Sequence, residues 1–188
     1  MQPASMSLPW WATERPDRDL IRTGAICAAV QVAVILTAGA AVWALAPGSW
    51  QSLIDDEQHT DAGALAVIAI TANNLLICCL PVLAGVYAHR LARHGRTWWA
   101  WAVLALAGLI VIRSLLVIGL VGGLDPAWLA GAAAWWLAEI AALAVCCAAG
   151  FNAARAADEL VASRQLAHAV AFACLLLPCA AIVEVALT

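Results

Sequence analysis

Long apolar stretches separated by short polar links form the main pattern of this chain. A helix needs about 20 residues to cross the roughly 30 Å of hydrocarbon in a bilayer, and each stretch reaches that length. Proline, glycine and aspartate mark several of their ends, as at Pro47-Gly48 and Asp125-Pro126. We therefore predict an all-α integral membrane bundle of five transmembrane helices within residues 20–188. The predicted helices are 20–46, 63–88, 98–121, 127–150 and 166–187.

The N-terminal residues 1–19 form a different kind of segment. They are polar and contain acids, and Trp10 and Trp11 lie among them. Tryptophan is enriched at the headgroup level of membranes, so we predict that this segment lies in the interface. The first apolar stretch is too long for the apolar region of a signal peptide, so we expect a retained helix and not a cleaved leader.

Arginine is distributed unequally between the links. All nine basic residues are arginines, and all but Arg113 lie before or just inside the first stretch, between the second and third, or between the fourth and fifth. The other two links, 47–62 and 122–126, contain acids and no arginine. By the positive-inside rule, we expect a cytoplasmic N-terminus and an external C-terminus at Thr188.

The composition excludes several classes of function. Of the 188 residues 65 % are hydrophobic and 11 % are charged, whereas a soluble domain is about half apolar and a quarter charged. No basic patch is present for a nucleic acid. The seven cysteines all lie in apolar stretches, where we expect packing residues and not disulfides. We expect no cofactor and no metal, because His59 among the acids of its link is typical of a solvated loop.

A few polar side chains interrupt the predicted helices. At 1.5 Å of rise per residue they fall into one layer, slightly to the external side of the midplane. The guanidinium of Arg113 is a natural partner for one carboxylate and for an asparagine carbonyl. Cys78 follows Asn74 by one turn and shares its face of the helix. The layer comprises Asn73, Asn74, Arg113, Glu139 and Glu184.

Two interpretations of this polar layer remain open. It is either a dry clamp that fixes the register of the helices, or a polar cavity that binds a peptide or ion or moves a proton. Ionisable groups at membrane depth are rare and often functional, whereas amides and hydroxyls also serve packing between helices.

Three short stretches resemble the stage II sporulation protein M family of multi-pass membrane proteins. "TANNLLICCLPVLAG" is similar to its asparagine-containing second helix, and "WWLAEIAALAVCCAAG" to its His-Gly-x-x-Glu-Leu helix, with Glu139 at the glutamate. "CAAIVEVALT" resembles the closing stretch, with Glu184 at its glutamate. The resemblance covers roughly 63–188. Trp135-Trp136 replaces the family's His-Gly, so chemistry that rests on that histidine does not carry over directly.

The resemblance implies a component of a bacterial cytoplasmic membrane that depends on partners. Relatives occur in gene clusters for ribosomally made antimicrobial peptides, so the expected role is maturation, export or immunity of such a peptide. Besides lipid, the expected partners are other membrane proteins or a second copy, with an apolar peptide as substrate class.

Two alternative functions follow from the polar layer itself. One is a membrane-embedded enzyme that epimerises, dehydrates or cyclises a peptide by proton transfer. Glu139 or Glu184 would then be the general acid or base. The substrate-holding residues would be Asn73, Asn74, Arg113 and Cys78. The other alternative is a small proton-coupled transporter, which the lack of a clear inverted repeat makes weaker.

Overall fold

Five long helices account for nearly all of the described chain. The computed structural model describes residues 18–45, 64–124, 126–156 and 159–187. Each helix is long and apolar enough to cross a membrane. This confirms the predicted all-α bundle of five candidate transmembrane helices. The helices are α2 (Arg18–Leu45), α4 (Ala64–Arg93), α5 (Thr97–Leu124), α6 (Pro126–Arg155) and α7 (Glu159–Leu187).

Two of the predicted segments lie outside the described residues. They are the interfacial segment, apart from Arg18 and Asp19, and the acidic link that contains His59. Within the described residues, α4 and α6 extend past their predicted ends and finish in turns that contain Arg93 and Arg155. Cations are favourable at a helix C-terminus, and the apolar pattern alone does not register such polar turns.

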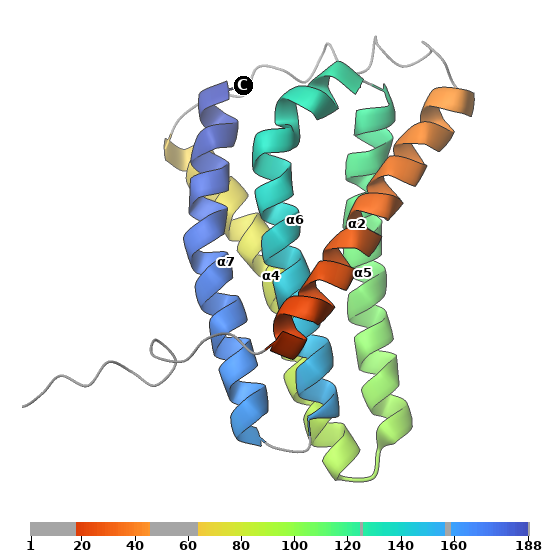
Figure 1. Ribbon diagram of the computed structural model, residues 1–188, viewed down its shortest axis with the longest axis vertical. Helices are drawn as coiled ribbons and strands as arrows, with labels where there is room; N and C mark the ends of the chain where they lie inside the picture. Colours follow the sequence, from red (N-terminus) through yellow and green to blue (C-terminus); the bar gives the residue numbers. More distant parts are fainter. Residues whose placement is uncertain (1–17, 46–63, 125, 157–158, 188) are drawn as a thin grey trace, which may run out of the picture.

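Arginines gather at one end of the bundle. We call it the arginine-rich end: α2, α5 and α7 begin there and α4 and α6 finish there, in the lower half of Figure 1. It includes Arg22 near the start of α2, and Arg90 and Arg155 near the ends of α4 and α6. The positive-inside rule predicts that this end faces the cytoplasm.

Helix α6 is the centre of the bundle. More than half of its apolar window, 56 %, is buried inside the protein, against 17–28 % for the other four helices. It packs on α2, α4 and α7, while α2 leans across it towards α5 (Figure 1). Its inward positions are mostly small, and Ala142, Ala148 and Ala149 are fully buried. Small side chains let neighbouring helices approach closely, which is how helices associate inside a bilayer.

Two helix crossings are close enough to require glycine. Where α4 meets α6, a Cβ on Gly85 would overlap the carbonyl oxygen of Gly150, and a Cβ on Gly150 would overlap that of Pro81. Where α2 meets α5, a Cβ on Gly119 would lie 2.6 Å from the carbonyl oxygen of Ile35. The backbones themselves form these contacts. Any side chain there would push the two helices apart.

One exposed ion pair joins α4 to α7 at the arginine-rich end. Arg93 Nη1 lies against Glu159 Oε1, with 60 % and 70 % of the two side chains exposed. Pairs this exposed contribute about 0–1 kcal/mol. We expect Arg93→Gln to change the free energy of unfolding in detergent by less than about 0.5 kcal/mol, no more than Arg96→Gln does. A much larger loss with Arg93→Gln alone would show that the pair fixes the α4–α7 connection.

Candidate intramembrane polar site

A hydrogen bond between α4 and α6 forms the centre of the polar layer. The side-chain amide of Asn74 donates to Glu139 Oε1, and both residues are half-buried. Close packing of α4 on α6 at the Gly85–Gly150 crossing, about three turns away along α4, holds the two helices near each other. The sequence predicts that Asn74 and Glu139 share a layer, and the structure brings their side chains into contact.

Two further predicted members lie beside this pair. Asn73 donates through Nδ2 to Asn74 Oδ1 at 3.4 Å, on an exposed part of α4. Glu184 on α7 is half-buried and close enough to Glu139 for the two carboxyl groups to interact electrostatically. The carboxyl group of Glu139, with its amide donor, can hold a proton or hydrogen-bond a water molecule.

A small cavity adjoins Asn74 and Glu139. Its volume is about 50 Å³, which is room for a few water molecules and not for a peptide. Besides those two side chains, its polar lining comes from Cys78, Ser114 and Trp136, and the rest is apolar. The polar layer is thus a contact between helices with little free space beside it. Sequence reasoning missed Ser114 and Trp136 as its neighbours, although they adjoin Arg113 and Trp135 in the chain.

Arg113 lies outside this layer, contrary to the expected ion pair. Its side chain is exposed on α5, and within the described residues it has no hydrogen-bond or ion-pair partner. The reason is helical geometry: successive residues are about 100° apart, and Ser114 is the residue that faces the cavity. The depth predicted for Arg113 gave no information on which face of α5 it occupies.

The adjacent cysteine pairs each direct a thiol into the core. Cys78 on α4 and Cys146 on α6 are buried, and Cys146 Sγ lies 3.8 Å from the carbonyl oxygen of Ala169. On the neighbouring face of α6, Cys147 Sγ lies 3.8 Å from Gln31 Nε2. All seven cysteines are free, as the sequence predicts. Their contacts are those of packing residues.

Gln31 is a second buried polar residue that sequence reasoning missed. It lies in the middle of α2 and is 4 % exposed. Its Nε2 contacts Cys147, while its Oε1 is buried without a partner in the described part of the chain. The sequence did contain a signal for this residue, because Gln31 carries a side-chain amide within an apolar stretch, as Asn74 does. It indicates a second polar contact between helices, at α2–α6.

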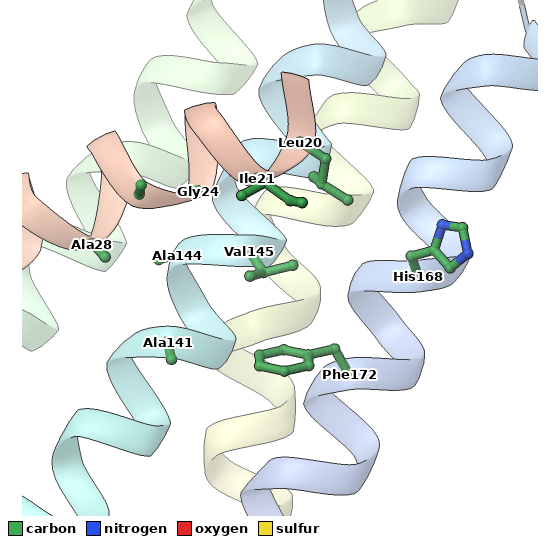
Figure 2. Close-up of a pocket in the computed structure, with 10 residues that line it drawn as sticks. Leu20, Ile21, Gly24, Ala28, Ala141, Ala144, Val145, His168 and Phe172 are labelled. Atoms are coloured by element: carbon green, nitrogen blue, oxygen red, sulfur yellow. The ribbon is translucent and has the colours of Figure 1, made fainter. Parts of the chain in front are cut away.

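Two larger pockets flank the N-terminal part of α2, and neither shares a lining residue with the small cavity. One has a volume of about 530 Å³ and an almost wholly apolar lining from α2, α6 and α7. Figure 2 shows Leu20 and Ile21 of α2 opposite His168 and Phe172 of α7. Such a lining suits an acyl chain or another apolar segment. The other pocket, at the arginine-rich end, has a mixed lining that includes Asp19, Arg22 and Arg155.

Comparisons with known proteins give no relative. No protein-family model, curated protein or solved structure matches this chain.

Proposed function

We propose that this multi-pass membrane protein is a component that works bound to a partner membrane protein, which it contacts through the outer side of α5. The observation that supports this most strongly is the exposed guanidinium of Arg113, which is without a partner among the described residues. A charged side chain at the centre of a bilayer costs about 3 kcal/mol or more. A carboxylate from a partner helix would offset that cost.

Arg113 lies near the middle of α5, far from both ends of the helix. Helix α5 has 28 residues, so Arg113 lies within about 4 Å of its centre along the axis. With the helix centred in about 30 Å of hydrocarbon, the Cα of Arg113 is about 11 Å from the nearer boundary. The neighbouring exposed positions, Leu109, Leu116 and Leu120, follow the same helical stripe and are apolar. One cation in an apolar stripe suits an apolar partner helix with one acid.

A second copy of this chain does not supply that acid well. In a copy with the same orientation, the acid at a similar level is Glu139, because Glu139 and Arg113 lie about 20 Å and 16 Å from the same end of the bundle. Glu139 is committed to Asn74 within the bundle. Glu184 lies only about 4 Å from that end. The partner we propose is therefore a different protein, with Asp or Glu inside a transmembrane helix.

A photo-crosslinking amino acid at Leu116 tests the proposal in host membranes. We expect one crosslinked partner, identified by mass spectrometry, with an acid in a transmembrane segment. Arg113→Leu should lower the crosslinking yield roughly tenfold or more, since each 1.4 kcal/mol of lost binding is a factor of ten. Arg113→Lys, which keeps the charge, should retain most of the yield.

The controls separate loss of partner from loss of fold. Arg96→Leu removes an arginine outside the α5 stripe and should leave the crosslink intact. The unfolding temperature of purified Arg113→Leu should not fall, because the side chain has no contact to lose within the described chain. An equal yield with Arg113→Leu, or a partner without a transmembrane acid, would refute the proposal.

The biological process proposed for this component is maturation, export or immunity of a ribosomally made peptide. The support for it is the sequence resemblance at Asn74, Glu139 and Glu184. Deleting the chain from a peptide-producing host should then reduce secreted active peptide or sensitise the host to it. Unchanged production and unchanged sensitivity would remove the peptide from the proposal and leave the partner contact standing.

An enzyme that moves a proton is the second candidate. The observation that favours it is the carboxyl group of Glu139 with the Asn74 amide and a water-sized cavity beside it. Glu139 could take or give a proton with the amide orienting it, and Glu184 would be a more distant second carboxyl group. Proton-coupled transport would use the same groups, and Glu184→Gln should then abolish flux in proteoliposomes.

A further inference from the structure

The pocket at the arginine-rich end, which we call the phosphate pocket, has the donors of an anion site. It lies between α2, α6 and α7 and has a volume of about 840 Å³. Two arginines line it, Arg22 from the first turns of α2 and Arg155 from the last turn of α6. Arg155 lies over the ring of Phe151, with 5.2 Å between its Cζ and the ring centroid, so the guanidinium is held at the mouth of the pocket.

A third donor lies in the pocket wall. Thr23 Oγ1 lies 3.4 Å from Asn152 Oδ1 and donates to it, which leaves the Nδ2 of Asn152 as the free end of that amide. This Nδ2 is buried and has no partner in the part of the chain that the structure describes. A buried amide donor without an acceptor is unfavourable. A bound ligand with acceptor oxygens would remove that cost.

The charges of the pocket favour a single anionic group. Its lining has two guanidinium groups, Arg22 and Arg155, and one carboxylate, that of Asp19. One positive charge therefore remains in excess in the lining. Arginine side chains bind phosphate oxygens through two parallel hydrogen bonds, more strongly than they bind neutral acceptors.

The remaining walls are apolar and indicate what carries the phosphate. Ile26, Phe151 and Val161 line the same pocket. Basic pockets between transmembrane helices on the cytoplasmic side bind anionic lipid headgroups. We propose that this pocket binds the phosphate of an anionic phospholipid, with Arg22, Arg155 and Asn152 as its ligands.

This site is independent of the partner proposed above. Arg113 lies on α5, and no residue of α5 lines the phosphate pocket. Loss of the α5 contact would therefore leave lipid binding unchanged.

Native mass spectrometry of the purified protein tests the site. Phosphatidylglycerol and phosphatidylcholine with identical acyl chains are added in turn, and bound lipid is counted. We expect one tightly held phosphatidylglycerol and no comparable phosphatidylcholine. Arg22→Gln with Arg155→Gln should weaken phosphatidylglycerol binding about tenfold or more. The matched control, Arg90→Gln with Arg96→Gln, removes the same charge at the same end of the bundle and should bind as the unmodified protein does.

A second variant guards against a fold effect of the double substitution. Asn152→Asp keeps the acceptor for Thr23 and replaces the Nδ2 donor by an anion, so it should weaken phosphatidylglycerol binding without unfolding the protein. Inorganic phosphate at millimolar concentration identifies the source: displacement of the lipid assigns the site to free phosphate, and retention assigns it to the headgroup. Equal binding of phosphatidylglycerol and phosphatidylcholine would overturn the proposed site. An equal loss of phosphatidylglycerol binding in the Arg22/Arg155 and Arg90/Arg96 double variants would overturn it as well.

Discussion

Gly150→Ala is expected to lower the unfolding temperature of the protein by roughly 5–10 °C in detergent, since overpacking costs about 1–3 kcal/mol or more. The added methyl group would overlap the carbonyl of Pro81 on α4. That neighbour is backbone and cannot change rotamer, so α4 and α6 must separate. Because α6 is the most buried helix, the separation also opens contacts that α6 makes with α2 and α7. Gly85→Ala should have a similar effect from the other side of the crossing.

The chain supplies its own controls for this result. A Cβ on Gly108 or Gly131 would meet no atom within 4 Å. Alanine is favoured over glycine inside a helix by about 0.5–1 kcal/mol, so Gly108→Ala and Gly131→Ala should unfold at the same temperature as the unmodified protein or slightly higher. Equal unfolding temperatures for Gly150→Ala and Gly131→Ala would contradict a backbone contact at the α4–α6 crossing.

Asn74→Leu is expected to destabilise the bundle by about 1–3 kcal/mol, because it leaves Glu139 in the core without its donor. Glu139→Gln should be nearly neutral, since the amide of glutamine keeps an acceptor oxygen for Asn74 in a side chain of the same shape. Asn74→Leu combined with Glu139→Leu should cost less than the sum of the single changes. The free energy of unfolding in a denaturing detergent series gives the coupling, which we expect at about 1 kcal/mol.

The same variants distinguish a structural contact from a catalytic one. A hydrogen-bonded clamp predicts that Glu139→Gln preserves both stability and biological activity. Proton transfer predicts a stable Glu139→Gln protein that is inactive, because a glutamine amide cannot exchange the proton. If Glu139→Gln itself destabilised the bundle as much as Asn74→Leu does, the hydrogen bond would not be the source of the effect.

The helices are predictable because a membrane imposes their length. An apolar stretch of about 20 residues has one structural outcome in hydrocarbon, so α5 matches its predicted bounds within a few residues. Depth is equally accessible, since it follows from the rise per residue. For this reason the sequence alone places Asn74 and Glu139 at one level, and their side chains do form a hydrogen bond.

The sequence did not reveal which side of each helix faces the bundle. In a soluble helix a polar face marks the side towards water, whereas in a bilayer the lipid side and the protein side of a helix are both apolar. The side of α5 that meets the bundle is set by Gly119 and Gly123, whose spacing of four residues packs against α2. That spacing was an available signal. Arg113 lies about 100° around α5 from these two glycines, so their spacing would have placed it to the side of the α2 contact.

The central position of α6 has a consequence for how the protein is made. Helices enter the membrane in chain order, so α2, α4 and α5 are inserted before the helix on which α2 and α4 pack. The α2–α5 crossing needs no residue of α6 and can close as soon as α5 is inserted. The α4 surface at Gly85, by contrast, cannot form its contact until Gly150 has been synthesised, and until then it faces lipid or another protein. We therefore expect the α4 surface at Gly85 to stay without its packing partner until α6 is inserted.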